Sequence, residues 1–231
     1  SIGRHCHWHW NKTYCLEPRL TKFAMLGFGF NSGKLKSHLK MANTRMQMSI
    51  NKKNNAIKVG RREVAGMLAE GKEEKARIRV EPLIRDENTI EAYEILSLIS
   101  ELLAERMRLI EANSQCPPDL VEGVSTLIYA ADRVDIPEFI EVKKQLVKKY
   151  GKTVANTAAG NIGGVCNERV VNKLSIQPPS AFLVVNYLQE LAVQHEVDWE
   201  PAGELPEEVA SGAFGVPTGY SVAGGFGSQY E

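Results

Sequence analysis

The sequence has no long apolar run and little cysteine. Even the stretch at residues 181–185 is far shorter than the roughly 20 apolar residues that a membrane span needs. None of the four cysteines forms a CxxC pair, so we interpret Cys116 and Cys166 as reduced thiols. Residues 1–24 also lack the apolar core that defines a secretory signal peptide. These absences argue against a membrane-spanning, secreted or disulfide-stabilised protein.

Motifs for catalysis are missing as well. The GKT segment at residues 151–153 resembles the end of a phosphate-binding loop, but Leu146 replaces the glycine that such a loop requires. His38 and His195 have no cysteine or carboxylate at a spacing typical of a metal site or a catalytic triad. We therefore predict that the chain is not an enzyme and needs no cofactor or metal.

The first 24 residues do not match the rest of the chain in composition. They contain residue types that bind zinc, but three histidines within five residues and a distant cysteine match no known ligand spacing. The residues concerned are His5, Cys6, His7, His9 and Cys15. We interpret residues 1–24 as a disordered or non-native leader that the fold does not need, and we place the start of the domain at residue 25.

Charge is balanced over the whole chain but unevenly distributed along it. The chain has 28 basic and 28 acidic residues. Residues 25–85 contain 14 basic and 5 acidic residues, whereas residues 86–231 contain 10 and 22. This division predicts a positive surface for anionic partners and an acidic part that can fold against it.

Residues 32–69 are predicted to form one long helix. Asn31 and Ser32 supply an N-cap, and no proline follows as far as Ala69. Apolar residues recur at spacings of three, four and seven, which is the pattern of one buried helical stripe. This stripe comprises Leu35, Leu39, Ala42, Met46, Ile50, Ile57, Val64 and Leu68.

A second helix is predicted from about residue 72 to residue 112. Gly71 is typical of a helix end, and the short turn after it requires an antiparallel hairpin. Pro82 should kink or break the second helix because it removes a backbone donor. The predicted apolar stripe of this helix comprises Ile84, Ile95, Leu98, Leu102 and Leu109.

Shorter helices follow the hairpin. Prolines introduce predicted helices from about residue 118 to 131 and from 137 to 150, and a loose stretch at residues 158–164 separates them from residues 165–174. A last amphipathic helix is predicted over residues 181–194, and residues 200–231 are interpreted as a disordered Gly/Ser/Pro linker. No strand pattern is present. The predicted fold is all-α, a long antiparallel helical hairpin with shorter helices packed on it.

The excess of basic residues on the hairpin favours an anionic partner. Nucleic-acid recognition commonly uses interleaved aromatic residues, which the first helix lacks. A membrane surface is therefore favoured, and a non-polymerising helical adaptor that binds RNA or another acidic partner is the alternative. The predicted membrane-binding residues are Lys34, Lys36, Lys40, Arg45, Lys52, Lys53, Arg61 and Arg62.

Several segments resemble the amino-terminal domain of the increased-sodium-tolerance family of ESCRT-III-like proteins. The most diagnostic is GKEEKARIRVE at residues 71–81, supported by RREVA at 61–65, VSTLIYAA at 124–131 and YLQELA at 187–192. The resemblance covers about residues 25–201, with the ESCRT-III-like domain itself assigned to residues 25–199. The residues of the hairpin motif that we single out are Gly71, Lys72, Arg77, Arg79 and Glu81.

The resemblance implies a scaffold or regulator with no enzymatic activity of its own. It implies co-assembly or self-assembly with ESCRT-III subunits, above all the type-one charged multivesicular body protein, and regulation of the vacuolar-sorting AAA ATPase. The implied processes are multivesicular-body sorting, endosomal tubule fission and cytokinetic abscission. The implied location is cytoplasmic and peripheral on endosomal membranes, with the midbody in dividing animal cells, and no nucleic acid is implied as a partner. Motifs for the ATPase and for MIT-domain proteins are expected beyond residue 231.

The resemblance also implies a docking surface on the last helix. Its matching positions are Tyr187 and Glu190 as partner contacts, together with Leu188 and Leu191, which are expected to face the hairpin. An edge tyrosine offers an apolar ring with a polar tip, which suits contact with a partner helix. The competing interpretation is that Tyr187 is a half-buried core residue.

Overall fold

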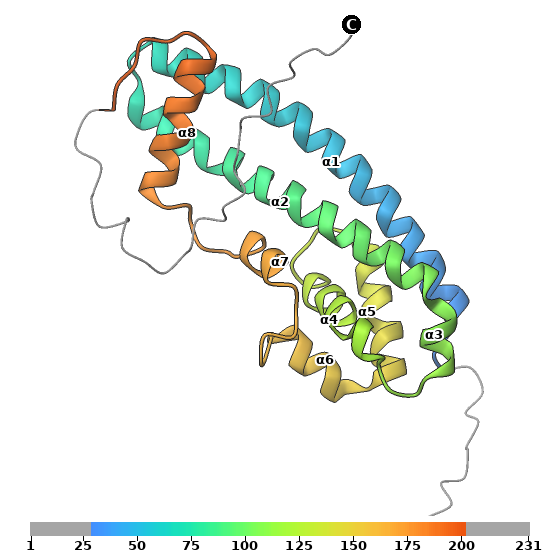
Figure 1. The fold of residues 1–231 in the computed structure, drawn as a ribbon. Coiled ribbons are helices and arrows are strands. Elements are labelled where there is room, and N and C mark those ends of the chain that lie inside the picture. Colours follow the sequence, from blue (N-terminus) through green and yellow to red (C-terminus); the bar gives the residue numbers. More distant parts are fainter. Residues whose placement is uncertain (1–28, 202–231) are drawn as a thin grey trace, which may run out of the picture.

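The computed structural model describes residues 29–201, and all the regular structure in this range is helical. The family resemblance had implied such a fold, and the all-α prediction is confirmed (Figure 1). The predicted leader and nearly all of the predicted linker lie outside the described residues. The helices are α1 (Ser32–Ala69), α2 (Glu73–Glu105), α3 (Met107–Ala112), the 3-10 turn η1 (Pro118–Leu120), α4 (Val121–Ala130), α5 (Pro137–Tyr150), α6 (Lys152–Ala159), α7 (Glu168–Lys173) and α8 (Ala181–Gln194).

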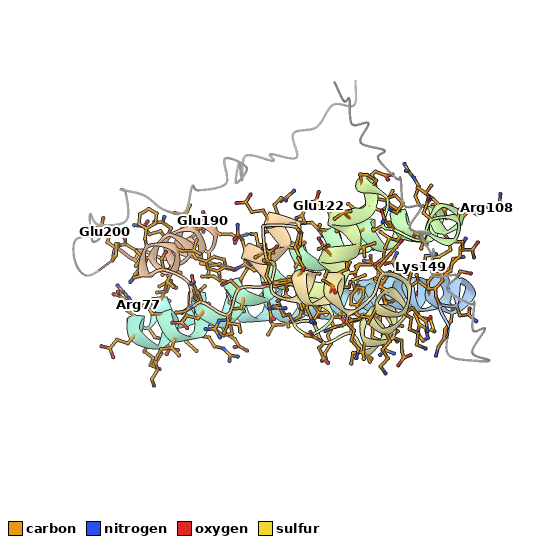
Figure 2. The ribbon with its side chains drawn as sticks, turned by 90° about the horizontal axis from the view of Figure 1, so that it is seen from below. Arg77, Arg108, Glu122, Lys149, Glu190 and Glu200 are labelled. Atoms are coloured by element: carbon orange, nitrogen blue, oxygen red, sulfur yellow. The ribbon has the colours of Figure 1, made fainter. Side chains whose placement is uncertain are left out.

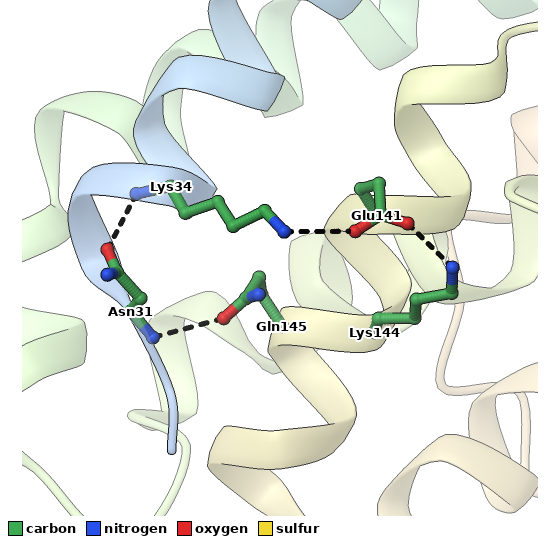
Figure 3. Close-up of polar contacts among 5 residues, drawn as sticks. All are labelled: Asn31, Lys34, Glu141, Lys144 and Gln145. Carbon is green, nitrogen blue, oxygen red and sulfur yellow. Dashed lines mark hydrogen bonds and ion pairs between the residues drawn. The ribbon is translucent and has the colours of Figure 1, made fainter. Parts of the chain in front are cut away.

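Helix α1 begins and ends at the predicted residues. The Asn31 side chain accepts a hydrogen bond from the Lys34 backbone N–H at 2.8 Å, which is an N-cap. The backbone N–H of Asn31 donates to Gln145 Oε1 of α5 at 3.0 Å. Beside this bond, Glu141 pairs with both Lys34 and Lys144 (Figure 3). The start of α1 is therefore fixed to α5 as well as capped.

A glycine turn reverses the chain between α1 and α2. Gly71 has φ +72°, a conformation that costs other L-residues energy. Its N–H donates to the Leu68 carbonyl at 2.9 Å, and the Lys72 N–H donates to the Met67 carbonyl at 2.9 Å. These bonds close the end of α1, and α2 returns antiparallel along it as predicted.

Two features of α2 differ from the prediction. Pro82 lies inside α2 without breaking it. Pro82 leaves the carbonyl of Ile78 without its helical donor, but both residues are exposed, so water can supply the missing partner. The helix instead ends at Glu105, and Arg106 separates it from α3.

Leu98 and Leu102 do not belong to the buried stripe of α2. They are 66% and 42% exposed, whereas Leu96 and Leu103 are fully buried. Helix α4 covers the other side of α2, where a Cβ on Gly123 would lie 3.1 Å from Leu103. The prediction assumed that a single face of α2 is buried along its whole length. Packing against α4 instead buries the face that carries Leu96 and Leu103.

The described residues form two apolar cores at opposite ends of the hairpin. The larger core joins the α1 and α2 ends to α4, α5 and α6, and it includes Phe139, Leu127 and Leu146. The smaller core lies at the hairpin tip, where α8 crosses both long helices (Figure 1). Helix α6 was not predicted, because the alanines and threonines at residues 152–159 give a weak apolar pattern.

Cys116 and Cys166 are both free, in agreement with their interpretation as thiols. Over residues 29–201, no helix combines the length and the apolar composition that crossing a bilayer requires. The same part of the chain has no cluster of three or more potential metal ligands.

Candidate functional site

Helix α8 lies across the tip of the hairpin and closes the smaller core. Ser180 caps it by accepting a hydrogen bond from the Leu183 N–H at 3.2 Å. The helix has the bounds predicted from the sequence. Leu188 and Leu191 are 0% and 2% exposed and pack with Val64, Leu68, Val80 and Ile84 of the hairpin. These two leucines therefore face the hairpin.

A polar cluster joins α8 to both hairpin helices within this apolar contact. Arg61 Nε of α1 donates to the Tyr187 hydroxyl oxygen at 2.9 Å, and Arg61 Nη2 donates to Glu87 Oε1 of α2 at 2.7 Å. The Tyr187 hydroxyl in turn donates to Glu87. Burial, together with the hydrogen bond to Glu87, raises the pKa of the Tyr187 phenol above its usual value. The phenol therefore stays protonated and can keep donating to Glu87.

Tyr187 is not at an exposed edge of α8, contrary to what the docking prediction assumed. Its side chain is only 8% exposed, and the Arg61 guanidinium lies 5.6 Å from the centre of its ring. The position corresponds to the competing interpretation of a core tyrosine. Glu190, one turn further along, is exposed on the outer side of α8 (Figure 2). The structure thus separates the two predicted contact residues into one internal anchor and one surface residue.

The outer side of α8 also carries apolar residues that the sequence analysis did not assign to docking. Phe182, Leu183 and Val193 are 37%, 43% and 81% exposed. A helical wheel at 100° per residue places all three on the side of α8 away from Leu188. Their exposure could therefore have been predicted from the sequence. Together with Glu190, they form a mixed apolar and acidic outer face of α8.

The eight predicted membrane-binding residues divide into two groups. Four pair with acids of other elements: Lys34 with Glu141, Arg45 with Glu138, Lys53 with Asp86, and Arg61 with Glu87. The others make no ion pair with any residue in the range 29–201; they are Lys36, Lys40, Lys52 and Arg62. Lys58 was not among the eight, and it likewise makes no ion pair with any residue in this range.

Most charged side chains of the hairpin motif form ion pairs near the tip. Arg79 of α2 pairs with Glu63 of α1 at 2.8 Å across the hairpin, and Arg77 pairs with Glu73 one turn before it. Lys72 pairs with Glu70 beside the glycine turn. Glu81 lies 4.0 Å from Arg85. These side chains therefore stabilise the hairpin turn and the antiparallel pairing.

Comparison with known proteins places this arrangement in a family. Residues 36–198 match the family model Ist1, described as a regulator of Vps4 activity in the MVB pathway. An IST1-like protein of Dictyostelium discoideum is 41% identical over 177 residues, which cover 76% of this chain and 48% of that protein. The vacuolar protein sorting-associated protein IST1 of Saccharomyces cerevisiae is 32% identical over 197 residues, which cover 81% of this chain and 65% of that protein. The chain thus spans about half to two thirds of the length of these relatives.

The fold is also similar to that of a solved structure. It is a crystal structure of the S. cerevisiae Ist1 N-terminal domain in complex with the Did2 MIM motif. The match has a TM-score of 0.66 at 32% identity and covers 77% of this chain and all of the solved chain.

Proposed function

The chain belongs to the Ist1 family, and from this premise we propose that it is the ESCRT-III-like module through which a regulator of the Vps4 ATPase engages its partners. The module has no catalytic role in this proposal. It acts by binding a short helix of an ESCRT-III subunit on α8 and by contacting a membrane with α1. The observation that supports it most is the exposed apolar and acidic face of α8, held on the hairpin by a buried anchor.

The partner proposed for α8 is a helix of the MIM type. A MIM motif, that of Did2, is present in the crystal structure of the yeast relative. Among the subunits implied by the resemblance, the type-one charged multivesicular body protein is the first candidate. An amphipathic helix binds by laying apolar side chains against an exposed apolar surface. Phe182, Leu183 and Val193 offer such side chains, and Glu190 offers a carboxylate to a basic residue of the helix.

Tyr187 has a positioning role in this proposal rather than a contact role. Its ring is buried, so a partner helix meets little of it. Its hydroxyl joins Arg61 of α1 to Glu87 of α2 and fixes where α8 lies on the hairpin. A loss of partner binding on changing Tyr187 would therefore arise from movement of α8.

The wider roles proposed for the protein follow from its family. They are co-assembly or self-assembly with ESCRT-III subunits and regulation of the ATPase in multivesicular-body sorting, endosomal tubule fission and cytokinetic abscission. The proposed location is cytoplasmic, peripheral on endosomal membranes and, in dividing animal cells, at the midbody. Interactions with MIT-domain proteins belong to the same proposal and involve residues outside the described range.

Fluorescence polarisation with a labelled carboxy-terminal helix of a type-one subunit tests the docking proposal. Leu183→Ser and Glu190→Ala should each weaken binding, and a hot-spot residue should cost about 2 kcal/mol or more. Leu98→Ser is the matched control, because Leu98 is an exposed leucine on α2 and lies about three helical turns beyond Glu87. The control should bind like the parent. Equal binding by all the variants, with unchanged melting curves, would contradict docking on α8.

A further inference from the structure

The second half of α2 exposes a face on which acidic and apolar side chains lie side by side. Leu98 and Leu102 are 66% and 42% exposed. The acidic members of the face are also exposed; they are Glu94, Glu101 and Glu105. At 100° per residue, all five side chains fall within about 100° around the helix axis. Single exposed apolar residues are common on protein surfaces, but core packing does not explain a leucine pair one turn apart among acids.

The negative charges of this face are not neutralised within the described part of the chain. The side chains of Glu94 and Glu105 make no ion pair or hydrogen bond with any residue from 29 to 201. Glu101 Oε1 accepts a hydrogen bond from Asn43 Nδ2 of α1 at 3.2 Å. Because an amide is neutral, this bond leaves the charge of Glu101 in place. Three carboxylates are thus available to a cation from outside.

A hollow of about 250 Å³ opens between α1 and α2 beside the acidic face. Its walls include Lys40 and Asn43 of α1 and Ser100, Glu101 and Glu105 of α2. Lys40 makes no ion pair with either glutamate. Sites for small molecules typically enclose about 300–1,000 Å³, whereas a cavity of about 150 Å³ holds one benzene molecule. The hollow is therefore of the right size for one long side chain.

Two polar atoms of the hollow have no hydrogen-bonding partner among residues 29–201, namely Ser100 Oγ and Asn43 Oδ1. Ser100 is fully buried. The orientation of the Asn43 amide is fixed, because a carboxylate only accepts and the amide nitrogen must therefore face Glu101. A buried polar group without a partner costs free energy. With Asn43 Oδ1 and two carboxylates as acceptors, the hollow suits a cationic donor such as a lysine ammonium.

We propose that this face of α2 binds a basic amphipathic helix of a partner protein, which places one lysine or arginine side chain in the hollow. Apolar residues of the bound helix pack on Leu98 and Leu102, and its other cations meet Glu94 and Glu105. The cation in the hollow donates hydrogen bonds to the acceptors that have no internal partner. The apolar pair contributes affinity, and the buried acceptors select a cation at one position of the helix.

A different protein is the source of this helix. Helix α1 of a second copy also carries cations without an ion pair to a described residue, such as Lys52 and Arg62, but the proposed function places α1 on a membrane. The choice of occupant rests on that proposed function, whereas the face and the hollow do not. The site is also separate from the docking face of α8, because Leu98 lies about 16 Å along α2 from Glu87, which anchors α8.

Fluorescence polarisation of labelled peptides against the full chain tests the inference. The probe is a peptide in which leucine and lysine residues are spaced to form a basic amphipathic helix. One control peptide has glutamate in place of lysine, and another has the same residues in scrambled order. The parent should bind the probe at least about tenfold more tightly than either control. Equal binding of the scrambled peptide would show a general attraction to acidic residues and would overturn the inference.

A charge-matched pair of variants locates the site. Glu101→Gln with Glu105→Gln removes two carboxylates at the hollow and should weaken probe binding about five- to tenfold at ~0.1 M salt. Glu74→Gln with Glu168→Gln is the control, because both glutamates are exposed, lie on the first turn of α2 and on α7, and make no ion pair within residues 29–201. The control should stay within about twofold of the parent. Equal loss in the two variants would contradict a site at the hollow.

Ser100→Ala separates a role in binding from a role in folding. The variant should bind the probe roughly tenfold more weakly, because the bound cation loses a hydrogen-bond acceptor. It should melt at or above the temperature of the parent, because a buried hydroxyl without a partner is removed. A serine that serves only the fold would give a lower melting temperature and unchanged binding. Unchanged probe binding by Ser100→Ala overturns the placement of a cation in the hollow.

Two further measurements identify the occupant. Leu98→Ser with Leu102→Ser should weaken probe binding several-fold and leave binding of the type-one carboxy-terminal helix unchanged, whereas Leu183→Ser should do the reverse. The inference and the docking proposal on α8 therefore fail separately, and loss of both peptides in the α2 leucine variant would indicate one shared site and overturn the inference. Sedimentation velocity of the full chain is the second measurement. Self-association that the Glu101→Gln, Glu105→Gln variant abolishes would assign the face to a second copy and overturn the inference of a partner protein.

Discussion

The hydroxyl oxygen of Tyr187 in α8 accepts a hydrogen bond from Arg61 Nε in α1 at 2.9 Å, across 126 positions of sequence. Both residues also bond to Glu87 of α2. One cluster therefore holds three helices together at the hairpin tip. The docking face of α8 depends on this cluster for its position, although the face itself contains none of these three residues.

Replacement of Tyr187 by Phe should destabilise the protein by about 1–2 kcal/mol, because Arg61 and Glu87 each lose a buried hydrogen-bonding partner. Replacement by Ala should cost about 3–5 kcal/mol, because it also opens a cavity in the tip core. Urea unfolding followed by circular dichroism gives both values. Tyr129 is an equally buried tyrosine, and its hydroxyl makes no hydrogen bond to a described residue. Tyr129→Phe should therefore change stability little, and a cost equal to that of Tyr187→Phe would refute the anchor.

Gly60 of α1 packs closely against Leu83 of α2. A Cβ at this position would lie 2.6 Å from Leu83 Cδ2, whereas a Cβ on Gly66 would meet nothing within 4 Å. Gly66→Ala should stabilise the protein by up to about 1 kcal/mol, because alanine is the better helix former. Gly60→Ala should lose this gain and destabilise the protein by about 1 kcal/mol, because Leu83 must move within a packed core.

A double-mutant cycle identifies the cause of the Gly60 effect. Leu83→Ala should cost less in the Gly60→Ala background than in the parent, since the crowded methyl groups are then gone. Thermal melts of the four variants supply the comparison. Additive effects would show that Gly60 and Leu83 do not meet.

The ion pair between Arg45 and Glu138 predicts an acid-sensitive contact between α1 and α5. The hydrogen bonds from Arg45 hold the pKa of Glu138 below its usual value. The ion pair therefore contributes its full stabilisation above the pKa that Glu138 has in the unfolded chain, about 4.3. This stabilisation is lost as the pH falls through that value towards the lower pKa of Glu138 in the folded protein. The parent should be more stable than Arg45→Gln at pH 7, and the difference should shrink below about pH 4.3.

Lys52→Gln removes a cation of the same helix that has no ion pair with a described residue. Its stability relative to the parent should stay nearly constant over the same pH range. Guanidinium unfolding at a series of pH values measures both curves. Parallel curves for Arg45→Gln and Lys52→Gln would contradict a specific role of Glu138.

The sequence was most informative where local signals agreed. Helix α8 follows two prolines and a serine cap, and both of its bounds were predictable for that reason. The environment of Tyr187 could not be predicted from the sequence. Its two hydrogen-bonding partners lie 100 and 126 positions away, and no local pattern indicates them. The exposure of Leu98 depends on where α4 packs, which is likewise a tertiary property. The split of the α1 cations into paired and free groups also required the structure, since their acids come from α2 and α5.

Pro82 was expected to kink or break α2, and α2 continues through it without a break. Pro82→Ala should therefore restore one helical hydrogen bond to the Ile78 carbonyl and raise stability by about 1–3 kcal/mol. Lys75→Ala, at an exposed position of the same helix, should stay within about 0.5 kcal/mol of the parent. Thermal melts decide between the outcomes. A loss of stability in Pro82→Ala would mean that the hairpin uses the proline to set the path of α2.

The central claim is that a partner helix docks on the outer face of α8, and site-specific photo-crosslinking tests it most directly. A benzoylphenylalanine is placed at Glu190 or, in a second protein, at Arg108, which lies at the opposite end of the molecule (Figure 2). Each protein is irradiated with the carboxy-terminal helix of a type-one charged multivesicular body protein. The account predicts a peptide adduct at position 190 and none at position 108. An adduct at 108 alone, or none at 190 while the peptide is bound, would contradict it.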